Sequence, residues 1–208
     1  VRNRNLLNLA GVTHLAQVVS SDEVDAMETA GFIFESEART DNQIARLYSN
    51  PQALPKVFLV PGGEWKAAAD ETRHAMTAKD FDPQKLVYLS GTKPPETLLS
   101  PNRDIRYSTE ITNYQPTQVD IAVTTDQPAY LILTDSTTPQ WQTYINNTPA
   151  PHLVANSIFK AAEVPAGEHT VSFRYRSPAT DLAKKLSLSG LAITLMILII
   201  PRARRYSI

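Results

Sequence analysis

The sequence contains no cysteine and little glycine, with 7 glycines in 208 residues. The absence of cysteine excludes disulfide bonds, thiolate zinc sites and cysteine nucleophiles. A large net charge is also missing, because 20 Lys and Arg side chains stand against 21 Asp and Glu, and this balance gives no general signal for nucleic-acid binding. Proline, in contrast, occurs 15 times, which suits a chain with many connections between strands.

Familiar catalytic motifs are absent as well. The 4 histidines are scattered and show no metal-ligand spacing. The sequence has no GxSxG, no HExxH, no P-loop and no GxGxxG. We therefore assign no catalytic residue, no metal ligand and no cofactor to this chain.

The most informative local feature is an uncharged apolar run near the C-terminus, Leu186–Ile200. As a helix it would span about 22 Å, short of the ~30 Å hydrocarbon core, but residues 182–185 extend it because Lys184 and Lys185 can reach the head groups. We predict one transmembrane helix over residues 182–201 and a basic cytoplasmic stub over 202–208. The alternative is a buried core helix, although such a helix usually shows a polar face.

Charge is distributed unevenly along the chain. Residues 1–183 carry 15 basic and 21 acidic side chains, whereas the 5 basic residues that follow have no acidic neighbours. Three arginines after the apolar run outnumber the two lysines before it, so the positive-inside rule places the stub in the cytoplasm and residues 1–181 outside the cell membrane. Because no signal peptide opens the sequence, we expect membrane helices upstream of Val1 in a longer protein.

The first hundred residues show mixed helix and strand patterns. A capping box at Ser20 and Glu23, with Gly31 beyond, predicts a helix over 21–30. Pro55 predicts that it lies either in an edge strand of a sheet or at the start of the strand that follows it. We expect an α+β segment over 1–100, ending in the proline-rich linker Thr92–Pro101. Its other predicted elements are strands at Phe32–Phe34, Ile44–Tyr48, Val57–Val60 and Leu86–Ser90, a turn at Pro61–Gly63 and a helix at Glu64–Ala78.

From Ile105 onward, apolar and polar residues alternate with a period of two. Turn signals separate these segments, among them Asp126–Pro128, Asn146–Asn147 and Pro165–Gly167. Several short alternating strands at close spacing predict an antiparallel β-sandwich over residues 101–181.

The densest cluster of polar and aromatic residues follows one of these strands. Trp141 and Tyr144 could stack on a sugar ring while Asp135 accepts hydrogen bonds from its hydroxyls, which makes the three candidate carbohydrate-binding residues. Alternatively, Trp141 fills the sandwich core and Asp135 stabilises a turn. Lys56 and Arg106 have no partner that the sequence can assign.

The order of several motifs resembles the C-terminal region of the YfhO-like bacterial membrane proteins. The resemblance is carried by Tyr130–Asp135, Pro139–Trp141 and Val164–Val171, by the apolar run that follows them, and by Asn50–Phe58 in the first half. Some residues depart from the family pattern: Gln140 replaces a usual Gly, Asn146-Asn147 a common Asp-Gly, and Lys56 a usual Arg.

The resemblance implies a polytopic protein similar to glycosyltransferases that take sugar from a polyprenyl-phosphate carrier. In that family the catalytic carboxylate lies in an early loop that this chain does not contain. The chain would then be a non-catalytic extracytoplasmic domain of the cell envelope. Its expected partners are the upstream membrane helices, the lipid bilayer and a lipid-linked sugar or envelope glycan, with no nucleic acid. A carbohydrate-binding module and a structural domain that holds a protein partner are the alternatives.

Overall fold

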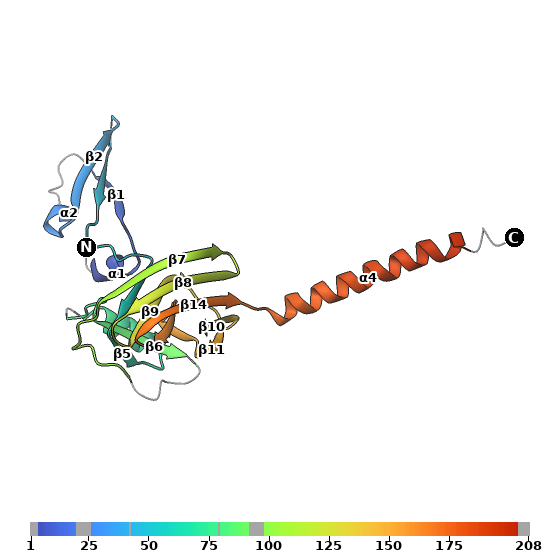
Figure 1. Cartoon of the computed structure of the whole chain (residues 1–208). Helices are drawn as coiled ribbons and strands as arrows, with labels where there is room; N and C mark the ends of the chain where they lie inside the picture. The colour runs from blue at the N-terminus through green and yellow to red at the C-terminus, as the bar shows by residue number, and fades with distance from the viewer. Residues whose placement is uncertain (1–3, 20–25, 42, 79, 92–97, 204–208) are drawn as a thin grey trace. The chain divides into compact units, whose positions relative to one another are not determined.

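A computed structural model describes residues 4–19, 26–41, 43–78, 80–91 and 98–203 (Figure 1). The side chains of residues 26, 181, 185 and 198–203 are not described either. The chain divides into two compact units, Val1–Arg174 and Tyr175–Ile208. The first unit holds three β-sheets, and the second holds one long helix.

The smallest sheet has three antiparallel strands in the order β1-β3-β2, with β1 at His14–Val19, β2 at Ile33–Arg39 and β3 at Ile44–Ser49. Two short helices precede its strands, α1 at Arg4–Leu9 and α2 at Ala26–Thr29. Gly31 has a φ of 82°, which confirms the prediction that it follows a helix end. The predicted capping box at residues 20–23 lies outside the described residues.

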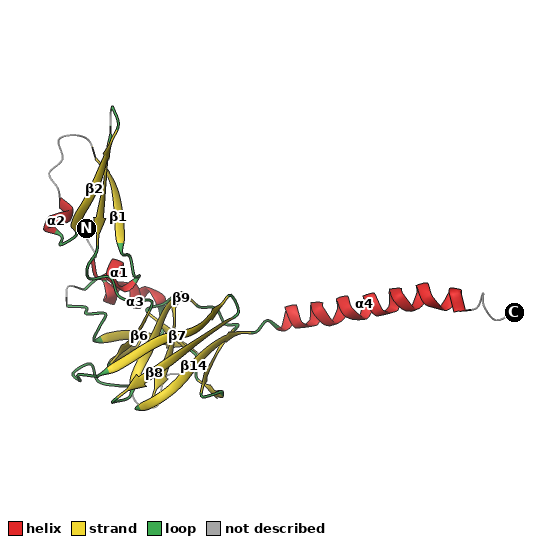
Figure 2. Ribbon diagram, turned by 45° about the horizontal axis from the view of Figure 1, so that its top comes forward, coloured by secondary structure: helices red, strands yellow, loops and turns green. Residues whose placement is uncertain are grey.

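The second sheet has five strands in the order β11-β10-β14-β8-β7. Figure 2 labels three of them, β7, β8 and β14. Asn146 and Asn147 join β10 to β11 with φ angles of 51° and 63°, as the tight hairpin turn predicted there requires. Inward residues of β8 alternate with outward ones, which confirms the period-two pattern. The strands are β7 (Tyr107–Gln115), β8 (Gln118–Thr125), β10 (Trp141–Ile145), β11 (Thr148–Ala150) and β14 (Gly167–Tyr175).

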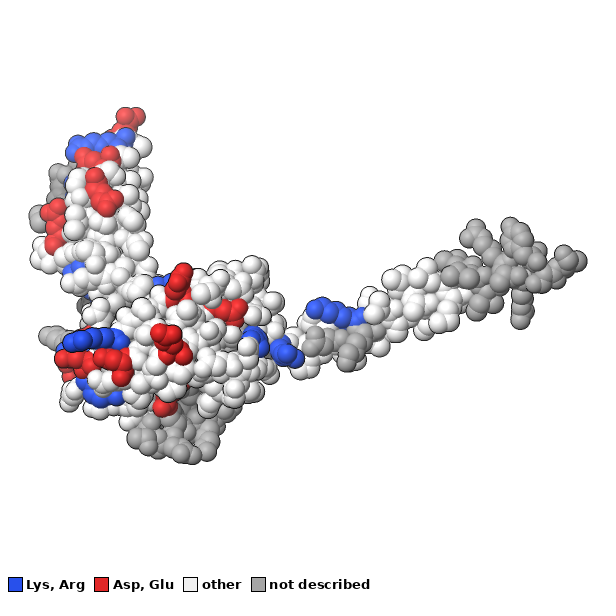
Figure 3. All heavy atoms as spheres, viewed as in Figure 1, with Lys and Arg blue, Asp and Glu red and all other residues white. Residues whose placement is uncertain are grey.

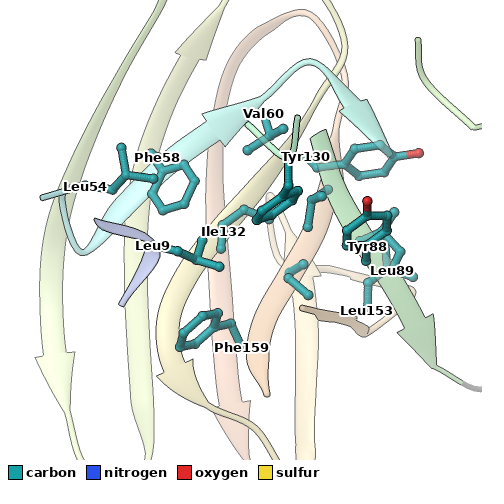
Figure 4. Packing of buried hydrophobic residues seen from close by; sticks show 14 residues of the cluster. Leu9, Leu54, Phe58, Val60, Tyr88, Leu89, Tyr130, Ile132, Leu153 and Phe159 are labelled. Carbon is teal, nitrogen blue, oxygen red and sulfur yellow. The ribbon is translucent and has the colours of Figure 1, made fainter. Parts of the chain in front are cut away.

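The third sheet has six strands in the order β4-β9-β13-β12-β6-β5. Only Pro61 separates β4 from β5, yet these two strands form opposite edges of the sheet, so the sheet curls back toward itself (Figure 4). The edge position of β4 confirms the prediction made from Pro55. The strands are β4 (Val57–Val60), β5 (Gly62–Trp65), β6 (Leu86–Gly91), β9 (Ala129–Ser136), β12 (Leu153–Ala155) and β13 (Phe159–Val164).

The structure corrects two predictions in this region. Gly62 and Gly63 belong to β5 rather than to a turn, and the helix that follows, α3, covers Ala69–Met76 instead of starting at Glu64. A Cβ atom on Gly62 would lie 2.4 Å from the Pro101 backbone, and one on Gly63 would lie 2.6 Å from the Tyr130 ring. The glycine pair therefore serves close packing of the strand, which its sequence alone does not reveal.

Two hydrophobic cores result from the curled sheet. One lies on its inner side, where Phe58, Tyr130, Ile132 and Phe159 are buried (Figure 4). The other lies between the six-stranded and five-stranded sheets, which pack face to face. Alternate residues of β9 enter the two cores, so the strand is buried on both faces. The second core contains Val57, Leu59, Val119, Ile121, Val123, Ala129, Leu131, Leu133, Ala162, Val164, Val171 and Phe173.

These sheets confirm the antiparallel, strand-rich fold that the sequence predicts. The six-stranded sheet draws β4, β5 and β6 from before residue 100 and the remaining strands from after it, so this sheet crosses the expected boundary at 100/101. Its β5–β6 pair is parallel, unlike its other pairs.

The second unit contains helix α4, Pro178–Ala203. Within the described part of the chain, no helix combines the length and the apolar character needed to cross a bilayer. The transmembrane helix predicted over 182–201 is therefore not supported. The side chains of its last residues, 198–201, lie outside the described part.

Candidate functional site

A polar and aromatic cluster lies where β9 ends. Lys56 Nζ lies 2.9 Å from Asp135 Oδ1, and the Tyr114 hydroxyl donates a 2.8 Å hydrogen bond to Asp135 Oδ2. Lys56 Nζ also lies 4.5 Å from the centroid of the Tyr114 ring. Hydrogen bonding to Tyr114 and then to Asp135 raises the pKa of Lys56. The three side chains thus satisfy one another at a partly exposed position.

Strand pairing positions this triad. β4 runs antiparallel to β9, with Val57 opposite Leu133, and the Thr134 N–H donates a 3.0 Å hydrogen bond to the Lys56 carbonyl. Lys56 therefore comes beside Asp135 at the strand ends. Tyr114 enters from the end of β7 in the other sheet, so the triad joins both layers of the sandwich.

A second lysine is buried between the sheets near the same strand end. Lys160 on β13 is 2% exposed, and its Nζ donates a 2.7 Å hydrogen bond to the Ser136 carbonyl. The same Nζ lies 4.0 Å from the centroid of the Trp141 ring. Burial lowers the pKa of Lys160, and the charge on Lys56 acts in the same direction while Asp135 opposes it. Among the described residues, no carboxylate lies within ion-pair distance of Lys160.

His152 lies beside this lysine with both ring nitrogens engaged. Its Nε2 lies 2.7 Å from Thr137 Oγ1 and its Nδ1 lies 2.8 Å from Thr143 Oγ1. Burial, with a smaller contribution from the Lys160 charge, lowers the pKa of His152 to about 4. The imidazole is therefore neutral at pH 7, and its two threonine partners hold it in place.

The structure does not bring the three candidate carbohydrate-binding residues together. Side chains alternate along β10, so Trp141 and Thr143 turn toward the core between the sheets while Tyr144 turns outward. Tyr144 instead stacks under Arg174, whose guanidinium carbon lies 4.5 Å from the ring centroid. Asp135 is engaged by Lys56 and Tyr114. This geometry favours the core role for Trp141.

A separate pocket of about 400 Å³ lies beside β4, and none of the three candidate residues lines it. Its wall includes Phe58, Asp104 and Tyr107, and Arg103 also reaches it. The Arg103 guanidinium donates hydrogen bonds of 2.8 Å to the Pro61 carbonyl and 3.0 Å to the Pro128 carbonyl. This arginine therefore braces the pocket wall against two neighbouring turns.

Comparisons with known proteins identify no relative of this chain. No family model, no curated protein and no solved structure matches the chain. Within the described residues, no group of three or more His, Asp and Glu side chains is placed to hold a metal ion. The function must therefore be argued from the chain itself.

The Lys56–Asp135–Tyr114 triad is expected to contribute modestly to stability. Asp135→Asn should lower the free energy of unfolding by about 1 kcal/mol, since it removes a half-exposed ion pair and weakens the bond from Tyr114. Glu64→Gln is a matched control, because the Glu64 carboxylate makes a longer, 3.5 Å ion pair with Lys66 and is half-exposed. Urea unfolding of both variants measures the difference, and equal costs would contradict a structural role for the triad.

Proposed function

We propose that this chain is a non-catalytic β-sandwich domain held at the outer face of a bacterial membrane by α4. In this proposal it forms the extracytoplasmic part of a polytopic protein similar to glycosyltransferases that use lipid-linked sugars. The single observation that carries the proposal is the surface of α4. Its large apolar side chains are 49–70% exposed: Leu182, Leu186, Leu188, Leu191, Ile193, Leu195, Met196 and Ile197.

These side chains cover most of the circumference of the helix. At 100° per residue, positions 186, 191, 188 and 196 point at about 0°, 140°, 200° and 280°. A helix that is apolar all round normally lies in the core of a large protein or in a membrane. Lys184 lies near the start of α4 (Figure 3), and residues 186–200 carry no charged side chain.

Two of the polar side chains in this stretch, Ser189 and Thr194, are suited to an apolar environment. Ser189 Oγ donates a 2.9 Å hydrogen bond to the Leu186 carbonyl, and Thr194 Oγ1 donates one of 2.9 Å to the Gly190 carbonyl. Both hydroxyls are thereby satisfied within the helix, as lipid requires. The apolar sequence also continues to Ile200.

The non-catalytic part of the proposal is supported by how the polar clusters are used. Lys56, Asp135 and Tyr114 bind one another, and Lys160 and His152 bind groups inside the sandwich. These side chains brace the two sheets rather than converge on an open cleft. The domain would then shape or support the side of the membrane protein that faces the acceptor.

Arginine substitutions in α4 test the membrane role. We expect the full chain, expressed in bacteria, to fractionate with membranes and to resist extraction at alkaline pH. A double variant, Leu191→Arg with Leu195→Arg, should leave the membrane fraction, because each arginine near the middle of a membrane helix costs about 3 kcal/mol on insertion scales.

The matched control places the same residue on the other unit. Ile158 is 54% exposed on the first unit, so Ile158→Arg should fractionate like the unchanged chain. Two results would overturn the proposal. One is that the unchanged chain appears in the soluble fraction, and the other is that the double variant and Ile158→Arg appear equally in the membrane fraction.

A further inference from the structure

β1 is an edge strand whose outer edge carries no strand among the described residues. Asn50 N–H donates a 2.7 Å hydrogen bond to the Thr13 carbonyl, and β1 pairs with β3 in the register that places Thr13 opposite Asn50. Hydrogen-bonded pairs alternate in an antiparallel ladder, so residues 13, 15, 17 and 19 bond to β3. The N–H and C=O groups of His14, Ala16 and Val18 therefore point away from the sheet.

Other long edges of the sheets are protected against pairing. β2 has an irregularity between Phe34 and Ser36, and its seven residues include Glu35, Glu37 and Arg39. β7 has an irregularity between Ile111 and Asn113 and carries Glu110. Bulges and charged side chains are the devices that keep strand edges from pairing with another chain.

The remaining edges are short. β4 and β5 have 4 residues each, and Pro55 and Pro61 flank β4. β11 has 3 residues, one of which is Pro149. β1 differs from all of these, because its six residues, HLAQVV, contain no Asp, Glu, Lys, Arg or Pro and its register with β3 is regular.

One face of this small sheet is also apolar and exposed. On the face that includes Val18 and Ile33, these two residues are 62% and 55% exposed, and the one acidic side chain that reaches it is Glu35 at the β2 irregularity, whose Oε2 lies 3.8 Å from His14 Nε2. The opposite face differs, since Val19 and Tyr48 are 4% and 0% exposed. An edge strand without Asp, Glu, Lys or Arg beside exposed apolar side chains is typical of a surface that meets another chain.

We propose that β1 pairs antiparallel with β1 of a second copy of this chain, about a two-fold axis at Ala16. In this register His14 lies opposite Val18 of the second copy, and Ala16 lies opposite its own equivalent. Both are hydrogen-bonded pairs, so every outward N–H and C=O of His14, Ala16 and Val18 gains a partner. The two three-stranded sheets become one sheet with the strand order β2-β3-β1-β1-β3-β2.

A second copy fits this edge because β1 is complementary to itself. The side-chain pairs in this register are His14 with Val18, Ala16 with Ala16 and Leu15 with Gln17, so no like charges meet. The same symmetric pairing of β2 with itself would place Glu35 opposite Glu37, which is unfavourable. Closed two-fold symmetry also prevents further growth, since β2 remains the outer edge on both sides.

Single cysteines test the register, because the natural chain has no cysteine. Ala16→Cys should form a disulfide-linked dimer under mild oxidation, since residues of a hydrogen-bonded pair have Cα atoms about 5.5 Å apart, within disulfide range. Ala45→Cys is the matched control on β3. In the proposed dimer its Cα atoms are separated by at least three strand spacings, about 14 Å, so it should stay unlinked.

Lysine substitutions test the association itself. In the full chain, solubilised in detergent, we expect a dimer by size-exclusion chromatography with light scattering. Ala16→Lys should raise the dissociation constant of the dimer at least tenfold, because two ammonium groups would meet at the axis, whereas Ala45→Lys should leave it within twofold. Ala16→Pro should act like Ala16→Lys, since the lost N–H points away from β3.

Three results would overturn the proposal. One is a monomer at about 100 μM together with no Ala16→Cys cross-link. Another is equal cross-linking of Ala16→Cys and Ala45→Cys, which would show random collision. The third is a dimer that forms equally in Ala16→Lys and Ala45→Lys, which would place the contact elsewhere than at β1. None of these readouts depends on membrane fractionation, so the dimer can fail while the membrane role holds.

Discussion

Trp141→Ala is expected to lower the free energy of unfolding by about 3 kcal/mol. Trp141 is partly buried against the core between the two sheets, and truncation of a buried tryptophan typically costs 3–5 kcal/mol. The substitution also removes the ring beneath the buried Lys160 ammonium, which would then retain only the Ser136 carbonyl among its named contacts. Chemical denaturation followed by circular dichroism measures the loss.

Tyr144 provides the control on the same strand. Its ring faces outward under the partly buried Arg174, so Tyr144→Ala should cost less than about 1 kcal/mol. The contrast between the two variants separates a core role from a ligand-binding role. A Trp141→Ala protein as stable as the Tyr144→Ala protein would contradict the core role and would restore the sugar-stacking hypothesis.

A double-mutant cycle isolates the contact between the ring and the lysine. Lys160→Met keeps the length of the side chain but removes its charge. If the 4.0 Å contact is favourable, Trp141→Ala should cost about 1–2 kcal/mol less in the Lys160→Met background than in the natural chain. Strictly additive effects would show that the ring acts only by filling space.

Strand positions with a simple alternating or edge pattern were predictable from sequence. Pro55 identified β4 as an edge, and the apolar alternation identified β8 and its neighbours. β5 was not predictable in the same way, because Gly62 and Gly63 are also typical of a turn. They form a strand because β5 pairs with β6, and the close approach of Pro101 and Tyr130 leaves no room for larger side chains. These contacts join segments far apart in sequence.

The contacts of the polar residues near the end of β9 also depend on strand pairing that the sequence does not reveal. Lys56 had no assignable partner, because its contact with Asp135 depends on the pairing of β4 with β9. Lys160 could have been found, since Ala162 and Val164 share its parity on β13 and turn toward the core between the sheets. A lysine on that face must be buried. The separation of Trp141 from Tyr144 followed from the same period-two rule, once the residues were known to share one strand.

Acid should destabilise the sandwich through His152. The pKa of His152 is lowered by burial from 6.5 to about 4 in the folded protein. Between these values the unfolded chain binds a proton at this site that the folded chain does not, so stability falls as the pH drops. The contribution of the neutral His152 side chain to stability is fully present above pH 6.5 and is lost progressively as the pH falls toward 4.

The size of this effect can be bounded. A shift from 6.5 to about 4 corresponds to about 3 kcal/mol, and solvent screening at the partly exposed ring reduces this to about 2 kcal/mol. His152→Gln removes the titration, so its stability should decline less than that of the natural chain between pH 7 and pH 4. The carboxylates titrate in both proteins and cancel in the difference.

Urea unfolding at several pH values between 7 and 4 measures the two profiles. His74→Gln is the matched control, because His74 is an exposed histidine on α3 and its loss should leave the acid profile of the natural chain unchanged. If the stability of His152→Gln fell with pH as steeply as that of the natural chain, the folded protein would bind the His152 proton as readily as the unfolded chain does. The hydrogen bonds between the ring and Thr137 and Thr143, with Lys160 nearby, would then have to accommodate the imidazolium despite its burial.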